Sequence, residues 1–433
     1  MNTLKTPPRY FFTIATILVV VPMLASAAWA VVPEKLLHSF NGTSGLQPAG
    51  LSMDPAGNLW GVTAEGGVGC PGSQPGCGTV FELTPISGGW KPKVIYAFKG
   101  GTDGALPWGN LAFDGLGNVY GTTVIGGSRT CACGTVFELT PQSGGYKETV
   151  LYRFAGINDG SGPVGGPVLD AAGNIYGTTS GGGTSGWGTV FKLSLNGGTW
   201  TESILHSFTA NPDGAGPSGS MVFDPQGNLY GSTPGGGTGH CSGTPAGCGT
   251  VFQLSPSSGG GWTESVLYEF QTGNDGGGPI SVIVSATGTL YGTTTFGGGT
   301  GCSQGCGTVF QLSPNGAGGW TETVIRTFSN SAAGQGPLAG VVLGSNGSLY
   351  GTTISGGLFG WGNAFELTPG STGWTETILH NFGKGKDGLL PATPLVFDSA
   401  GKIYGTTYYG GTDQSGVCNG SPIGCGTVFQ LTP

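Results

Sequence analysis

A tandem repeat of about 57 residues constrains the fold of this chain more than any other feature. An aromatic residue followed by Gly-Thr-Thr or a close variant occurs seven times, at Trp60, Tyr120, Tyr176, Tyr230, Tyr291, Tyr350 and Tyr404. A second motif, Gly-Thr-Val-Phe, starts at Gly78, Gly134, Gly188, Gly249, Gly307 and Gly426, with a variant at Gly362. Self-similarity at such a period is typical of solenoids, propellers and repeat arrays.

Each copy contains four strand-like segments, such as residues 219–224, 228–233, 249–255 and 262–270. The 92 glycines and 28 prolines would normally indicate low complexity, but the 37% hydrophobic residues form short runs beside regularly placed glycines. The first two segments are joined by Asp-Pro-Gln-Gly-Asn, which is typical of a tight hairpin. With no helical pattern, the repeats predict an all-β, seven-bladed β-propeller of four-stranded antiparallel blades.

The ends of the repeat array are complementary. Residues 35–40 match the fourth strand of a repeat, whereas residues 426–433 match the third. We therefore expect the N-terminal strand to complete the last blade and close the ring. The alternative is that each blade starts at the fourth strand, in which case the blades are continuous and no such closure exists. Residues 31–433 are predicted to form one propeller domain.

The first 30 residues have the pattern of a signal peptide. Lys5 and Arg9 precede an apolar run over residues 10–24, and Ala28-Trp29-Ala30 resembles a cleavage site. The alternative is an uncleaved membrane anchor, for which the run is short. Cleavage after Ala30 removes two basic residues, so the net charge becomes −8 − 2 = −10. We expect a secreted, periplasmic or cell-surface monomer that neither binds nucleic acid nor inserts into membranes after cleavage.

The ten cysteines fall in pairs, each within the loop between the second and third strands. In each pair the second cysteine directly precedes the glycine of Gly-Thr-Val-Phe. An exported chain with this pattern predicts five loop-local disulfides, Cys70–Cys77, Cys131–Cys133, Cys241–Cys248, Cys302–Cys306 and Cys418–Cys425. Whether Cys131 and Cys133, which flank a single residue, are bridged stays open. Metal binding is the alternative, but no second ligand pair lies nearby.

Blades three and six lack the cysteine pair, and Trp187 and Trp361 stand in its place before the glycine. In a propeller these loops share one face with the loops between blades, hereafter the loop face. Asp-Gly occurs in five of the interblade loops, at Asp103, Asp159, Asp213, Asp275 and Asp387. Ser44 and Ala333 replace the aspartate in the other two. These carboxylates could bind calcium or sugar hydroxyls, but Asp-Gly is also ordinary turn chemistry, which we favour. No other cofactor is expected.

A second set of aspartates lies in the hairpins of the opposite face, at Asp54, Asp114, Asp170, Asp224 and Asp398, and is interpreted as turn-forming. His38, His206 and His380 occupy a fourth-strand position that holds tyrosine in other repeats, so they are interpreted as structural. His240 lies in a loop beside Cys241 and remains a candidate binding residue. No residue is assigned a catalytic role.

Several aromatic residues fall on the predicted loop face and could stack on sugar rings. They are Trp108, Trp187, Phe296, Phe359, Trp361, Tyr408 and Tyr409. Trp108, in Leu-Pro-Trp-Gly, has no aromatic counterpart in the other repeats. It is therefore the leading candidate for ligand binding.

The repeat units, of the form Leu-Tyr-Gly-Thr-Thr, Gly-Thr-Val-Phe-Glu-Leu-Thr-Pro and Gly-Trp-Thr-Glu-Thr-Val-Leu-Tyr, resemble GloVer repeats. These occur in bacterial "choice-of-anchor tandem repeat" exported proteins, and the resemblance covers nearly all of the chain after residue 30. It implies an exported bacterial repeat protein and assigns no activity.

Three functional classes remain. The first choice is a binding or scaffold module that recognises polysaccharide or a surface partner through its disulfide-containing loop face. The alternatives are a polysaccharide lyase, a hydrolase or a streptogramin-lyase-like enzyme on the same fold, and a purely structural repeat protein.

Overall fold

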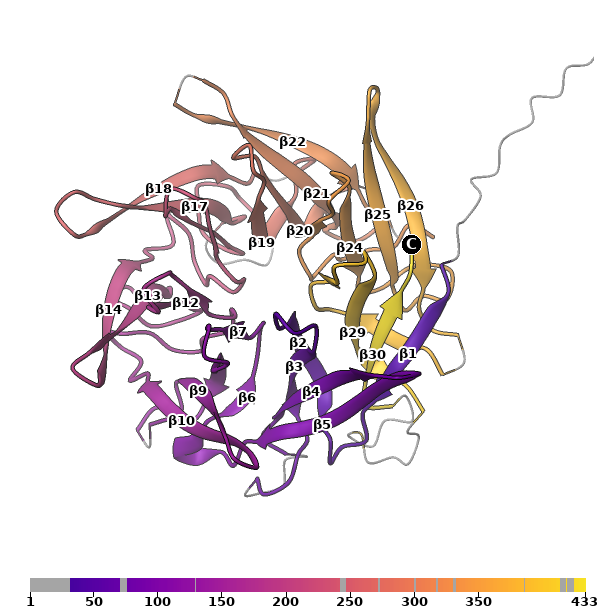
Figure 1. Cartoon of the computed structure of the whole chain (residues 1–433). Helices are drawn as coiled ribbons and strands as arrows, with labels where there is room; N and C mark the ends of the chain where they lie inside the picture. Colours follow the sequence, from indigo (N-terminus) through magenta and orange to yellow (C-terminus); the bar gives the residue numbers. More distant parts are fainter. Residues whose placement is uncertain are drawn as a thin grey trace, which may run out of the picture.

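Seven antiparallel sheets are arranged around a central axis in the computed structural model (Figure 1). The structure describes residues 32–70, 76–128, 130–241, 247–271, 273–299, 301–316, 318–329, 332–384, 386–412, 418 and 424–433. The predicted signal peptide lies outside these residues. The described part of the chain has one 3₁₀ turn, η1 (Gly101–Asp103), and no helix long and apolar enough to span a bilayer.

The blades follow one another along the chain, each running from the axis to the rim. Blade 1 contains β2 (Leu46–Met53), β3 (Leu59–Glu65), β4 (Thr79–Ile86) and β5 (Gly89–Ala97). Blade 2 contains β6 (Ala105–Pro107), β7 (Ala112–Phe113), β8 (Val119–Ile125), β9 (Thr135–Gln142) and β10 (Gly145–Arg153). Blade 3 contains β11 (Val168–Leu169), β12 (Ile175–Thr179), β13 (Thr189–Asn196) and β14 (Thr199–Ser207). Blade 4 contains β15 (Val222–Phe223), β16 (Leu229–Thr233), β17 (Thr250–Pro256) and β18 (Trp262–Glu269).

The remaining blades repeat this plan. Blade 5 contains β19 (Gly277–Val284), β20 (Leu290–Gly298), β21 (Gly305–Pro314) and β22 (Trp320–Thr327). Blade 6 contains β23 (Val342–Leu343), β24 (Leu349–Thr353), β25 (Asn363–Gly370) and β26 (Gly373–Asn381). Blade 7 contains β27 (Gly388–Pro391), β28 (Val396–Phe397), β29 (Ile403–Gly410), β30 (Thr427–Leu431) and β1 (Glu34–Ser39).

The predicted closure of the ring is confirmed. Strand β1 pairs antiparallel with β30, with Glu34 opposite Leu431 and Ser39 opposite Thr427 (Figure 1). Blade 7 therefore takes its outer strand from the N-terminal part of the chain and its other strands from the C-terminal part.

A phenylalanine pair at every blade interface explains two of the repeated motifs. The phenylalanine after each outer strand packs edge-to-face or tilted on the Gly-Thr-Val-Phe ring of the next blade, at centroid distances of 4.9–5.3 Å. Phe40 on Phe81 and Phe98 on Phe137 are two of these seven pairs. The glycine of Tyr-Gly-Thr-Thr lies under the same ring, so a Cβ on Gly121 would overlap Phe137. The motifs are thus packing motifs of the core.

The hairpin aspartates form turns, as predicted. Asp54 Oδ1 accepts hydrogen bonds from the backbone N–H groups of Ala56 and Asn58, at 2.9 and 2.8 Å. Its Oδ2 accepts from Asn58 Nδ2 and from Trp60 Nε1. Asp114, Asp170, Asp224 and Asp398 make the same backbone contacts. The hydrogen bonds of these carboxylates therefore stabilise the hairpin turns.

The inner strands of blades 3, 4 and 6 are shorter than the sequence suggested, whereas β2 and β19 have eight residues each. In blade 4, the expected strand over residues 219–224 is reduced to Val222–Phe223. The preceding glycines pack backbone to backbone between blades, and a Cβ on Gly219 would overlap the Ile280 carbonyl. Close packing at the axis therefore replaces a regular ladder, and it shapes the channel described next.

Candidate functional site

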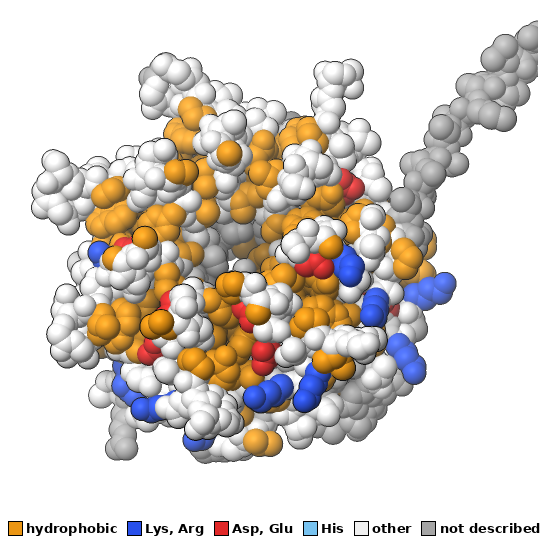
Figure 2. Space-filling view, viewed as in Figure 1, with side chains coloured by type: hydrophobic (Ala, Val, Ile, Leu, Met, Phe, Trp, Pro, Cys, Tyr) orange, Lys and Arg blue, Asp and Glu red, His pale blue; other side chains and the backbone are white. Residues whose placement is uncertain are grey.

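A channel runs along the axis of the ring. Its loop-face portion has a volume of about 400 Å³, and it shares wall residues with a second hollow of about 580 Å³. The inner segment of every blade has a proline, and the residue after it lines the first portion of the channel: Ala49, Trp108, Val164, Ser218, Ile280, Leu338 and Ala392. Figure 2 looks onto the face that carries the strand hairpins and shows hydrophobic side chains around the hollow at the centre of the ring. The channel is therefore a mainly apolar site with a seven-residue ring at its wall.

Trp108 is the only aromatic residue of that ring, and its side chain is 37% exposed. Tyr408 of blade 7 lies next to it, with ring centroids 6.4 Å apart, although the two residues belong to blades separated by blade 1. Tyr409 packs edge-to-face on Tyr408 at 5.1 Å. Burial, with smaller contributions from Tyr409 and Glu65, raises the pKa of Tyr408 to about 12, so its hydroxyl is protonated at neutral pH.

Gln47 places an amide beside these rings. Its Nε2 donates a hydrogen bond to Tyr409 Oη at 3.4 Å, and its side chain is buried. Its backbone is left-handed, with φ of 56°. Four blades have glycine at this position, whereas blades 7, 1 and 2 have Leu390, Gln47 and Leu106, all with φ of 55–56°. Non-glycine residues in this region cost on the order of 1 kcal/mol, and such strain concentrates at functional sites.

The left-handed backbone accompanies a hydrogen bond between neighbouring blades. In each blade the carbonyl of the residue before Gly-Thr-Val-Phe accepts a hydrogen bond from the N–H of this position in the next blade. Cys425 accepts from Gln47 at 3.0 Å, and Trp187 accepts from Gly216 at 2.8 Å. This hydrogen bond and the left-handed backbone occur in all seven blades. They therefore do not explain why blades 7, 1 and 2 have a side chain at this position where the other four blades have glycine.

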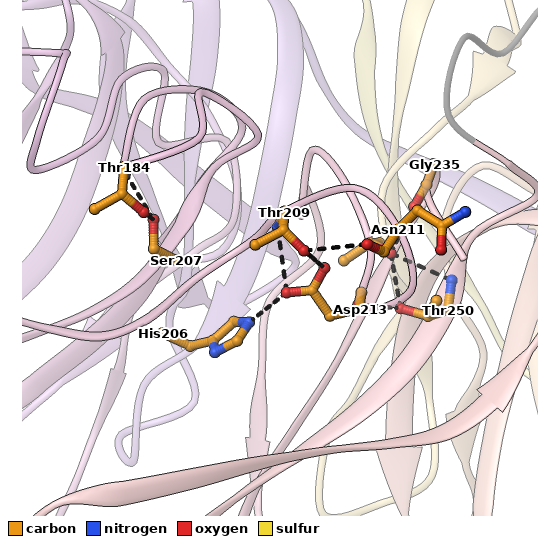
Figure 3. Close-up of polar contacts among 9 residues, drawn as sticks. Thr184, His206, Ser207, Thr209, Asn211, Asp213, Gly235 and Thr250 are labelled. Carbon is orange, nitrogen blue, oxygen red and sulfur yellow. Dashed lines mark hydrogen bonds and ion pairs between the residues drawn. The ribbon is translucent and has the colours of Figure 1, made fainter. Parts of the chain in front are cut away.

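The five Asp-Gly carboxylates do not converge on the channel. Each is held within its own interblade loop by a side chain seven residues earlier. Tyr96 donates to Asp103 at 2.7 Å, and His206 Nε2 lies 2.9 Å from Asp213. Figure 3 shows the same Asp213 carboxylate receiving the Thr209 backbone N–H and hydroxyl. Asp159, Asp275 and Asp387 are held in the same way by Tyr152, Tyr268 and His380.

The histidines of these pairs replace tyrosine at one repeat position, and no set of three metal-ligating side chains occurs in the described residues. The structure therefore gives the carboxylates a turn-locking role in the loops. The two loops without aspartate follow His38 and Arg326. Burial lowers the pKa of His38 to about 4, and Arg326 instead pairs with Glu376 of the next blade at 2.7 Å.

The other candidates lie apart from Trp108. Trp187 and Trp361, each 37% exposed, are in blades 3 and 6. Their backbones bridge to Gly182 and Gly356. His240 is exposed on the loop of blade 4. The sequence pattern predicts a binding role for Trp108, Tyr408 and Tyr409 but not for Gln47. Only the positive φ distinguishes Gln47, and the signal in the sequence was the absence of glycine.

All five predicted disulfides are present, with Cα–Cα distances of 5.1–5.4 Å. No free cysteine occurs among the described residues. Disulfides persist in oxidising compartments, which indicates that this chain functions outside the reducing cytoplasm.

The family of the chain follows from its repeats. The model of the Gloeobacter/Verrucomicrobia repeat matches residues 29–156, 130–301 and 299–433. The chain therefore belongs to this repeat family, in agreement with the resemblance to GloVer repeats. No curated protein matches it significantly.

Solved propellers share the fold at low sequence identity. A catalytically inactive virginiamycin B lyase from Staphylococcus aureus, solved with quinupristin, has a TM-score of 0.54 and 16% identity, covering 93% of this chain and all of that one. A Bacteroides uniformis protein assigned as a 6-phosphogluconolactonase has a TM-score of 0.50 and 15% identity, covering 77% and 86%. The extracellular domain of a protein assigned as a one-component system in B. thetaiotaomicron has a TM-score of 0.52 and 10% identity, covering 91% and 40%. These likenesses show the fold alone.

Proposed function

We propose that this protein is an exported binding module that holds a polysaccharide at the loop-face mouth of its channel, on blades 7, 1 and 2. The observation that carries the proposal is the pairing of Trp108 with Tyr408 across blade 1, beside the strained residue Gln47. Aromatic faces stack on the apolar faces of sugar rings, and an adjacent amide can hydrogen-bond their hydroxyls. A cavity of about 400 Å³ is large enough to admit a sugar unit.

Replacing Trp108 with alanine should abolish glycan binding while the fold is retained. Trp108 is partly exposed, so its loss removes a stacking surface and little core packing. The measurement is a glycan array with the mature protein and the Trp108→Ala variant, with unfolding temperatures measured in parallel. Trp187→Ala is the matched control, because Trp187 is equally exposed at 37% but lies in blade 3.

Loss of the array signals in Trp108→Ala alone supports the proposal. Equal signals in both variants would contradict it. Release of glycan products in the same wells would instead favour an enzyme, and an empty array would favour a purely structural repeat protein.

Gln47→Gly should weaken glycan binding without destabilising the fold. Glycine adopts the left-handed backbone freely, which offsets the loss of the buried amide contact, so the free energy of unfolding should change by about 1 kcal/mol or less. Binding should fall several-fold because the amide beside Tyr409 is gone. Leu390→Gly is the control for relief of strain alone. If the Gln47→Gly variant binds glycan with unchanged affinity, Gln47 is not part of the binding site.

A further inference from the structure

The net charge of this chain does not describe its surface. One of its 22 acidic residues, Asp413, lies outside the described residues, which leaves 21. Of these 21 residues, Asp213 is buried and the other 20 are half-buried, so none is fully exposed. The fold uses them in hairpin turns, as with Asp54, in interblade loops, as with Asp213, and at blade interfaces, as with Glu376.

The exposed charges are instead positive and lie on one side of the ring. Eight described Lys and Arg side chains are exposed, and all belong to blades 7, 1 and 2 or to the loop leading into blade 7: Lys35, Lys91, Lys93, Lys99, Lys147, Arg153, Lys384 and Lys386. Figure 2 shows basic side chains along one side, over the outer strands β1, β5 and β10. We call these eight residues the basic sector.

Repeat positions show that the basic sector is not required by the fold. Lys91 and Lys147 follow the aromatic residue that opens an outer strand, where blades 3 to 6 have Thr201, Thr263, Thr321 and Thr375. Lysines on edge strands can prevent edge-to-edge association. Strands β14, β18, β22 and β26 are equally outermost in their sheets without any lysine at this position. Edge protection alone therefore does not explain lysines confined to three neighbouring blades.

We propose that the basic sector binds an acidic polysaccharide, one that carries carboxylate groups along its length. Clustered ammonium groups attract a polyanion, and the half-buried carboxylates beside them, such as Glu82 near Lys93 and Glu148 near Lys99, offset that attraction only in part. The sector lies on the outer strands of the same three blades as Trp108 and Tyr408, and it extends from the interblade loops, with Lys99 and Lys384, toward the hairpins of the opposite face, with Lys91 and Lys147. This proposal rests on the proposed function, because the choice of a glycan over other polyanions comes from the proposed glycan site at Trp108 and Tyr408.

The test compares binding of polygalacturonate and of neutral dextran to the full mature protein at low and high salt. The Lys91→Gln/Lys93→Gln/Lys147→Gln variant should bind polygalacturonate about tenfold more weakly at low salt, since each exposed charge contributes modestly. Binding by the wild type should also weaken as salt increases. Lys192→Gln on blade 3, outside the basic sector, is the matched control and should bind normally.

The two proposals fail in different ways. Salt-dependent polygalacturonate binding that is lost in the triple variant supports the basic sector, even if Trp108→Ala has no effect. Array signals that depend on Trp108 while the triple variant binds polygalacturonate normally overturn the basic sector and leave the channel site intact. Tighter binding of single-stranded DNA or of phosphatidylglycerol vesicles than of polygalacturonate also overturns it. If the triple variant aggregates but its affinity for polygalacturonate is unchanged, the lysines serve only to prevent edge-to-edge association, and the proposal is overturned.

Discussion

A chain that begins at residue 43 is expected to unfold at a much lower temperature than one that begins at residue 31. The deletion removes β1, which completes blade 7 by pairing with β30. It also removes Phe40, which is fully buried against Phe81 of blade 1. Loss of the Phe40 ring alone should cost about 3–5 kcal/mol, and loss of the strand should cost more because the edge of β30 is left unpaired.

Two variants separate loss of closure from general damage. Phe40→Ala and Phe98→Ala remove the same ring from equivalent interfaces, and we expect similar losses in thermal unfolding experiments because the closing interface is packed like the others. A synthetic peptide of residues 32–42 should restore part of the lost stability to the truncated chain. An unchanged unfolding temperature after the deletion would show that β1 does not hold the ring.

The second large effect is a loss of stability as the pH rises through neutrality. Glu34, Glu148, Glu202, Glu264 and Glu322 occupy one position of the outer strands, each with a buried oxygen that lacks a hydrogen-bond partner. Burial, together with a smaller contribution from a nearby aspartate such as Asp159 beside Glu202, raises the pKa of each to about 7. His380 opposes this effect at Glu34, and Arg153 and Lys99 oppose it at Glu148.

The sign follows from linkage. The folded state binds these protons more tightly than the unfolded state, in which the carboxyl pKa is near 4.5. Their stabilising effect is complete below about pH 4.5 and is lost as the pH rises through about 7. The unfolding temperature should therefore be lower at about pH 8 than at about pH 5. Buried His38 acts in the opposite sense only at acidic pH, where it must remain neutral in the fold.

Single substitutions identify the groups responsible. Glu202→Gln should raise stability at about pH 8 and reduce the pH dependence, because the neutral amide avoids a charge beside Asp159. Glu376→Gln is the control, because Glu376 faces Arg326 rather than an aspartate. It should destabilise the protein by leaving Arg326 without its counterion. A stability that is constant or rises between these pH values would contradict the assignment.

The number of repeats predicted the architecture because the repeated motifs form the packing contacts between blades. The glycine under Phe137 and the turn around Asp54 recur because every interface needs them. The match of residues 35–40 to an outer strand was enough to place β1. The inner strand of blade 4 was predicted too long, because close contacts such as that of Gly219 with Ile280 depend on the neighbouring blade.

The candidate site was only partly predictable. Trp108 stood out as a departure from the repeat, but its pairing with Tyr408 depends on closure between blades 7, 1 and 2. The composition indicates an acidic protein. In the fold, however, the described carboxylates make contacts in loops and at blade interfaces, whereas eight Lys and Arg side chains are exposed to solvent. Exposure is a property of the fold, so a sum of charges could not reveal the basic sector.

We propose that a glycan binds at the loop-face mouth of the channel on blades 7, 1 and 2. Hydrogen–deuterium exchange of the mature protein, with and without the strongest glycan from the array, tests it most directly. Exchange should slow in residues 46–48, 105–110 and 404–410, which surround Trp108 and Tyr408. Protection confined to the loops of blades 3 to 6, or to the hairpins of the opposite face, would contradict the claim.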